Sequence, residues 1–123
     1  MAIRESGEMY LESIYVLLSR SNRVRAIDVA EYTGYKKSSV SRAMGLLRDN
    51  GCIVTDADGY ISLTPFGVEL AQKTYERHEI LTGYFMKLGV SEKVAASDAC
   101  RIEHVISDES FKAVKKHYLG YKD

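Results

Sequence analysis

Apolar residues recur at intervals of three and four positions near the start of the chain, with polar residues between them. This spacing places them on one face of an α-helix and predicts an amphipathic helix over about residues 5–20. The positions that form this face are Met9, Tyr10, Ser13, Ile14, Leu17 and Leu18. We therefore expect the first helix to pack one side against a core.

Two further helical segments follow before residue 52. The stretch AIDVAEYTGY predicts a short helix that ends near Gly34, and KSSVSRAMGLLRDNG predicts a longer one. The longer helix should open near Ser38, whose hydroxyl can cap free backbone amides. It should close at Asn50 and Gly51, which are residue types that commonly end helices.

The small and apolar positions of these two segments predict that they pack against each other. Ala30 allows two helices to approach closely, and Gly34, four residues later, permits a sharp turn. Val40, Ala43 and Leu47 then hold the second segment across the first. This arrangement is typical of a helix-turn-helix.

Two short apolar runs, CIVT and YISL, are separated by the sequence DADG. Asp and Gly tolerate the positive backbone dihedral angles of a tight turn, so the segment predicts a two-stranded β-hairpin. A hairpin directly after a helix-turn-helix makes a winged helix, whose ribbon can lie along the DNA backbone.

The second half of the chain predicts three more helices. Thr64 followed by Pro65 is a helix-start signal, and a long apolar stripe then continues to a stop near Gly89. Two shorter helices are predicted over about residues 91–106 and 108–118. The stripe of the long helix consists of Val68, Ala71, Tyr75, His78, Leu81 and Phe85. The fold class is therefore mainly α with a small β hairpin.

This order of elements divides the chain into two functional regions. Residues 1–64 are predicted to form a winged helix-turn-helix DNA-binding domain, and residues 65–123 a helical domain. Hydrophobic content of 46% and charged content of 28% are ordinary for a protein with its own core. No apolar run approaches the roughly 18 residues that span a bilayer. We expect a cytoplasmic protein with no membrane partner, in which Cys52 and Cys100 remain free thiols.

Seventeen basic and seventeen acidic residues cancel over the whole chain, but they are unevenly distributed. Between Arg20 and Arg48 there are seven basic residues and two acidic ones. Basic and hydroxyl side chains crowd the start of the predicted recognition helix, where they can contact phosphates and base edges. The predicted DNA-binding residues are Arg25, Lys36, Lys37, Ser38, Ser39, Ser41 and Arg42. The alternative interpretation is a solvated basic face without a ligand.

A thiol, a carboxylate and an imidazole lie within five residues of one another on the predicted fifth helix. Cys100, Glu103 and His104 are spaced i, i+3 and i+4, which would place them on one helix face. Thiolate and imidazole suit borderline transition metals such as ferrous iron, cobalt, nickel and zinc, and a carboxylate adds charge. The spacing alone leaves open a buried cysteine, a surface ion pair and a core histidine.

Three ligands leave a coordination sphere incomplete, and further ligand types occur elsewhere in the chain. Met9 and Glu12 lie three residues apart on the first predicted helix, and His78 interrupts the apolar stripe of the fourth. Each could complete a metal site. Equally, a lone histidine on an apolar face and a methionine on a packed helix are common core residues.

Several motifs in fixed order resemble the DtxR/MntR family of metal-dependent transcriptional repressors. They are EMYLESIYVL, SSVSRAM, LTPFG, RHEIL and DACRIEHVISDE, and the resemblance covers about residues 5–118. It implies a homodimer with an N-terminal winged-helix lobe and a C-terminal helical dimerisation lobe, and a divalent metal as corepressor.

The resemblance also implies a set of metal ligands. The family's ligand positions correspond to Met9, Cys100, Glu103 and His104. The iron-responsive branch has methionine and cysteine at the first two positions, whereas the manganese branch has aspartate and glutamate. This sequence is therefore similar to the iron type, and Fe²⁺ is the favoured metal, with Mn²⁺, Co²⁺, Ni²⁺ or Zn²⁺ as alternatives.

A second metal position matches the family less completely. His78 matches a ligand of both branches, and Glu12 matches a carboxylate of the manganese branch. Thr82 and Ala96 stand where the iron branch has a carboxylate and an imidazole. A hybrid second site of Glu12, His78 and Glu103 is the alternative. The chain also ends short of the SH3-like domain that many iron-type members carry.

The function that the resemblance implies is repression of metal homeostasis genes. The homodimer would bind a palindromic double-stranded DNA operator, with metal binding setting the dimer geometry. A manganese-responsive regulator and a thiol-redox-sensing winged-helix regulator that uses Cys100 are alternatives. A metal-dependent hydrolase would need a substrate cleft and a separate general base, for which the sequence offers no motif, so we expect no enzyme.

Overall fold

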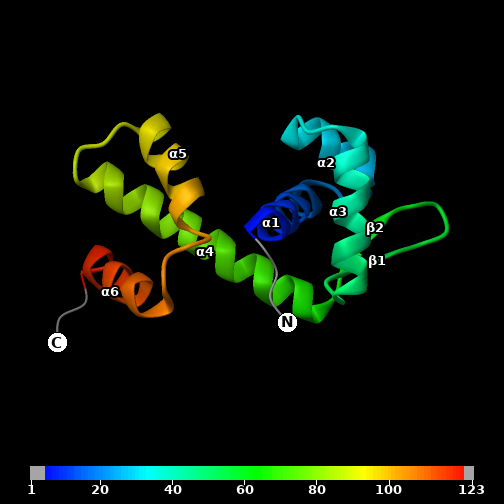
Figure 1. Ribbon diagram of the computed structural model, residues 1–123. Coiled ribbons are helices and arrows are strands. Elements are labelled where there is room, and N and C mark those ends of the chain that lie inside the picture. The colour runs from blue at the N-terminus through cyan, green and yellow to red at the C-terminus, as the bar shows by residue number, and fades with distance from the viewer. Residues whose placement is uncertain (1–4, 121–123) are drawn as a thin grey trace. The chain divides into compact units, whose positions relative to one another are not determined.

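The computed structural model describes residues 5–120 and separates into two units, one ending at Gln72 and the other beginning at Lys73. The first unit contains α1 (Glu5–Arg20), α2 (Ala26–Thr33), α3 (Lys37–Asp49), β1 (Ile53–Thr55), β2 (Ile61–Leu63) and the start of α4 (Pro65–Lys87) (Figure 1). The second unit contains the rest of α4, α5 (Glu92–Ile102) and α6 (Asp108–Tyr118). The predicted fold class, mainly helical with one small hairpin, is confirmed.

Every element of the first unit contributes to a single hydrophobic core. The predicted apolar face of α1 enters it, with Tyr10 and Ile14 buried and Met9 partly buried against them, and Leu11, outside that predicted face, is buried as well. The largest fully buried apolar side chains of the core are Leu11, Ile14, Leu47, Ile53, Val29 and Val40. Burial of such side chains is the main stabilising term for a unit of this size.

The turn between α2 and α3 is the one that the sequence predicts. Ala30 is buried, and the amide of Gly34 donates to the Ala30 carbonyl oxygen at 2.8 Å. Gly34 has a φ of 77°, a left-handed conformation that costs a glycine little. Helix α3 begins at Lys37, close to the predicted start near Ser38. The predicted cap by the Ser38 hydroxyl was wrong, because Lys36 is the N-cap residue and Ser38 is already helical.

The strands β1 and β2 pair antiparallel, with Ile53 opposite Leu63. The loop between them is held by Asp56, whose Oδ1 accepts hydrogen bonds from the amides of Asp58 and Tyr60, both at 2.9 Å. This is an Asx-type turn, in which a short carboxylate replaces backbone acceptors. Such a loop projects from the unit as a compact wing.

The connection from the hairpin to α4 depends on Thr64 and Gly67. The Thr64 hydroxyl accepts from the Gly67 amide at 3.0 Å and donates to the Gly51 carbonyl oxygen at 2.6 Å. It therefore caps the first turn of α4 and links that turn to the backbone just after α3. A side chain at Gly67 would overlap the Cys52 carbonyl oxygen, so the helix approaches the backbone of the hairpin closely there.

In the second unit, the predicted range of the fifth helix was too long. Helix α5 ends at Ile102 instead of Ile106, and residues 103–105 form a turn that leads to α6. The predicted helix over 108–118 is confirmed, and its N-cap Ser107 accepts from the Ser110 amide at 3.1 Å. Among the described residues, no helix is long and apolar enough to cross a membrane.

Candidate functional site

The N-terminus of α3 presents the side chains that the sequence assigns to DNA. Lys36, Lys37 and Ser38 are exposed there, as are Ser41 and Arg42 one turn further on, and Ser39 is half-buried. The N-cap residue makes no side-chain cap hydrogen bond, and the first turn holds no acidic residue. The first backbone amides and the positive end of the helix dipole are therefore available to an anion such as a DNA phosphate.

Arg25 lies at the N-cap of α2 and belongs to a basic cluster with the hairpin. Its Nη2 donates to the Tyr60 hydroxyl at 3.0 Å, and the Nη2 of Arg23 donates to the same oxygen at 3.1 Å. Both guanidinium carbons lie over the Tyr60 ring, at 4.4 and 5.1 Å from its centroid. These hydrogen bonds, first that of Arg23 and then that of Arg25, lower the pKa of Tyr60.

The sequence reasoning did not identify Tyr60 as part of the basic face. The available signal was the alternation Arg23, Val24, Arg25, in which Val24 is buried and both arginines are exposed. An extended segment that buries every second residue aims its two charges to the same side. The cluster joins the base of the wing to the start of α2.

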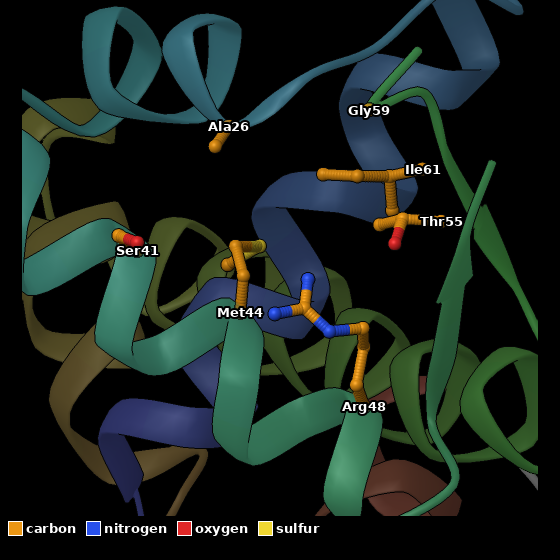
Figure 2. A pocket seen from close by; sticks show the side chains of 7 residues that line it. All are labelled: Ala26, Ser41, Met44, Arg48, Thr55, Gly59 and Ile61. Atoms are coloured by element: carbon orange, nitrogen blue, oxygen red, sulfur yellow. The ribbon is translucent and has the colours of Figure 1, made fainter. Parts of the chain in front are cut away.

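A hollow of about 160 Å³ lies between α3 and the hairpin (Figure 2). Ser41, Met44 and Arg48 line it from α3, and Thr55 and Ile61 from the strands. The Arg48 side chain points into the space between Met44 and Ile61 (Figure 2). A hydroxyl and a guanidinium therefore face the gap between α3 and the hairpin, which makes Arg48 a further candidate beside the predicted DNA-binding residues.

The candidate metal ligands of the second unit gather around the carboxylate of Glu103. Its Oε1 lies 3.3 Å from Nδ1 of His78 and 3.9 Å from Nε2 of His104. The Glu103 residue is only 1% exposed, although a charged side chain is rarely buried without a partner of opposite charge. The structure thus brings together two imidazoles and a carboxylate, including His78, which the sequence placed in a possible second site.

Cys100 lies on α5 and is exposed, whereas Glu103 is buried. The prediction that Cys100, Glu103 and His104 all lie on the fifth helix was wrong, because α5 ends at Ile102 and the other two residues belong to the turn beyond it. That the three side chains share one metal site stays a prediction. Thr82 and Ala96 are half-buried.

Met9 and Glu12 lie on α1, in the first unit, and both are half-buried. Within residues 5–120, no group of three or more His, Cys, Asp and Glu side chains is arranged as a metal site. The chemistry of the Glu103 cluster nevertheless fits a divalent cation. Its Oε2 is buried and has no hydrogen-bond partner among the described residues, and a bound cation would compensate that charge.

Both halves of the chain match known protein families. Residues 3–60 match the family described as "Iron dependent repressor, N-terminal DNA binding domain". Residues 64–121 match "Iron dependent repressor, metal binding and dimerisation domain". The order of the two matches is the order of the two units.

Individual relatives match over most of their length. An uncharacterized HTH-type transcriptional regulator of Methanocaldococcus jannaschii is 31% identical over 121 residues, 97% of this chain and 97% of that protein. The transcriptional regulator MntR of Salmonella typhimurium is 34% identical over 110 residues, 89% of this chain and 70% of that protein. These relatives are regulators of transcription, not enzymes.

Solved structures share the fold. The manganese regulator SloR has a TM-score of 0.82 and 24% identity, over 99% of this chain and 56% of the SloR chain. The metal-dependent transcriptional regulator MtsR has a TM-score of 0.84 and 24% identity, over 95% of this chain and 54% of the MtsR chain. This chain therefore spans about half the length of these two solved proteins.

The winged helix with a basic recognition helix, the buried carboxylate among imidazoles and the two family matches lead to one assignment. The chain belongs to the DtxR/MntR family of metal-dependent transcriptional regulators, whose repressors bind operator DNA and dimerise.

Proposed function

We propose that this protein is a cytoplasmic repressor of metal homeostasis genes that binds a palindromic operator as a homodimer when ferrous iron is bound. The observation that carries the metal dependence is the Glu103 carboxylate, which is buried beside two imidazoles and keeps one oxygen without a described partner. Such a carboxylate is costly without a cation. Metal binding would relieve this cost and set the dimer geometry that fits the operator.

The proposed ligands are Met9, Cys100, Glu103 and His104. The roles of Met9 and Cys100 rest on the resemblance to iron-responsive members, and the cluster geometry supports those of Glu103 and His104. Sulfur ligands favour ferrous iron over manganese, which prefers oxygen. When bound, the cation supplies positive charge to the buried carboxylate and bonds that restrain the turn after α5.

A manganese signal is the second candidate. The short distance between His78 and Glu103 supports a site that does not use sulfur, with Glu12 as a third ligand. Structural neighbours described as a manganese regulator and as a manganese-dependent transcriptional repressor share the fold. Occupancy of this second site would give two metals per subunit.

For DNA, we assign the contacts to the start of α3 and to the wing. Lys36, Lys37 and the three serines would hold phosphates, and Arg42 is long enough to donate to a purine edge in the major groove. Arg25 and Arg48 flank this set from α2 and from the hollow beside the hairpin.

The test is a titration of the full chain under anaerobic conditions. The DNA is a duplex enriched by the protein from a random-sequence library in the presence of Fe²⁺, and fluorescence anisotropy measures its binding. We expect a palindromic duplex, operator affinity raised about 10-fold or more by Fe²⁺, and loss of that gain with chelator, which corresponds to a coupling of about 1.4 kcal/mol or more. Equal affinity with Fe²⁺ and with chelator would refute the proposal.

Two matched variants distinguish the loss of a metal ligand from the loss of any one negative charge. Glu103→Gln should abolish the metal response, whereas Asp98→Asn, at an exposed position on α5, should retain it. A larger response to Mn²⁺ than to Fe²⁺ would select the manganese candidate. DNA binding that is sensitive to peroxide and indifferent to metal would select thiol sensing at Cys100.

A further inference from the structure

Helix α4 carries a buried arginine next to the histidine that contacts Glu103. Arg77 is 8% exposed, and its guanidinium lies 5.4 Å from the ring centroid of Phe111 on α6. A charged side chain is seldom buried unless it has both an ionic partner and several hydrogen bonds. We therefore expect Arg77 to have both an ionic partner and several hydrogen bonds.

The guanidinium of Arg77 binds the segment that joins α5 to α6. Its Nη1 donates to the carbonyl oxygen of Glu103 at 3.2 Å and to that of Ile106 at 2.7 Å. Its Nη2 donates to Oδ1 of Asp108, in the first turn of α6. Arg77 thus satisfies carbonyls beyond the end of α5 and anchors the start of α6 with one rigid, planar group.

Glu103 is consequently held from two adjacent positions of α4. Arg77 binds its backbone carbonyl, and His78, the next residue, contacts its carboxylate at 3.3 Å. The amide of Glu103 still donates to the Ala99 carbonyl oxygen of α5 at 2.9 Å, but its own carbonyl lies beyond the end of the helix. The Arg77 bond to that carbonyl is therefore a second restraint on where the Glu103 carboxylate can lie.

Asp108 has a distinct part in this arrangement. Among the residues that the structure describes, Arg77 forms its ion pair with Asp108 and not with Glu103. Lys73 and then Arg77 lower the pKa of Asp108, so its carboxylate stays ionised beside the guanidinium. We expect that without Asp108 the guanidinium of Arg77 would lose its ionic partner and be attracted to the Glu103 carboxylate, where it would compete with a metal ion.

We propose that Arg77 is a positioning residue for the metal ligand Glu103, and that Asp108 keeps its guanidinium on the backbone of the turn and away from the Glu103 carboxylate. The inference rests on the proposed role of Glu103 as a ligand. It adds that α6 is linked to the metal centre through Arg77, because Asp108 and Phe111 of α6 hold that side chain.

The first experiment compares Arg77→Lys with Glu76→Gln in the full chain. Lysine keeps the charge but cannot bind two carbonyls and a carboxylate in one plane. Glu76→Gln weakens a different contact between α4 and α6, the 2.8 Å ion pair with Lys115, and leaves the turn untouched. Affinity for Mn²⁺ is measured by EPR of the free ion, and affinity for Fe²⁺ by anaerobic competition with a chromophoric chelator.

We expect Arg77→Lys to lower metal affinity by about 10-fold or more, in the range seen for residues that orient ligands, and Glu76→Gln to leave it within about 2-fold. In metal-free protein, hydrogen exchange of the amides of residues 103–106 should be faster in Arg77→Lys alone. Far-UV circular dichroism shows that both variants are folded. Wild-type affinity in Arg77→Lys, or equal losses in both variants, would overturn the proposal.

The second experiment compares Asp108→Ala with Glu109→Ala. Both remove an acidic residue from the first turn of α6, so both lose the same favourable interaction with the helix dipole. Only Asp108→Ala should weaken metal binding, and adding Arg77→Met to it should restore part of the loss. Equal affinities in the two single variants would contradict the role of Asp108. If Glu103→Gln itself binds metal like wild type, the proposed metal site fails instead.

Discussion

Tyr60 joins the wing to the basic face of the first unit through a single oxygen atom. Its hydroxyl accepts from Arg23 and Arg25, and both guanidiniums lie over its ring. Two like charges are thus held close together by an acceptor and a π face. A phosphate that approaches them could replace the phenol as the acceptor, so we expect the cluster to bind the DNA backbone.

The ionisation of Tyr60 gives a direct measurement of this cluster. Both arginines stabilise the phenolate, so the pKa of Tyr60 should lie below the ordinary value of about 10. The difference at 295 nm between titrations of wild type and Tyr60→Phe reports that pKa, and Arg23→Gln should raise it. Because the arginines lower the pKa of Tyr60 only in the folded state, the free energy of unfolding rises as pH rises through the lowered pKa, and this gain is lost below that pH. A Tyr60 that ionises near 10 would contradict the cluster.

At the residue level, the sequence pattern predicted one continuous helix over the proposed ligands Cys100, Glu103 and His104, and the structure shows a shorter one. The i, i+3, i+4 spacing placed Cys100 with Glu103 on a continuous helix, whereas α5 ends at Ile102 and Cys100 is exposed. The carbonyls freed by that early end bind Arg77, a residue 26 positions earlier in the chain. A tertiary contact of this kind leaves no local periodicity, and so local spacing could not reveal it.

Helix boundaries were predictable where a local signal ends them. Gly34, the Thr64–Pro65 pair and Asp108 mark boundaries that the structure reproduces, because backbone conformation and caps are local properties. The start of α3 differs because Ser38 makes no cap, and Lys36 stands at the N-cap position. A recognition helix without a side-chain cap leaves its first amides available to a phosphate. The usual preference for a capping serine is therefore not met at the place where we propose DNA binding.

Gly67 tests the close packing of α4 against the hairpin. A Cβ at this position would meet the Cys52 carbonyl oxygen, a backbone atom that cannot rotate away. Gly67→Ala should therefore destabilise the first unit by about 1–3 kcal/mol, measured by urea denaturation. The control is Gly45→Ala on α3, where the nearest atom to an added Cβ is Nη2 of Arg48 at 3.9 Å. That variant should be neutral or more stable by up to about 1 kcal/mol, and equal losses in both would contradict the close approach.

The distribution of charge over the whole molecule separates the DNA-binding region from the remainder. Basic and acidic residues are equal in number over the chain, so net charge alone gives no attraction to DNA. The excess of basic residues between Arg20 and Arg48 creates a local field on the winged helix, and the remaining sequence carries the compensating acidic residues. In a homodimer, the two basic winged helices would be attracted to DNA. The rest of the surface, with its acidic residues, would not attract polyanions.

Salt dependence measures how many of these charges contact phosphates. Each neutralised phosphate lowers the logarithm of the association constant by roughly 0.9 per decade of salt, so operator binding should weaken steeply between 50 and 200 mM salt. Lys37→Ala at the start of α3 removes one contact per subunit and should reduce the slope by about 2 for a dimer. Lys112→Ala on the exposed side of α6 changes the net charge equally, and its slope should match wild type. Equal slopes in both variants would mean that the start of α3 does not contact the phosphate backbone.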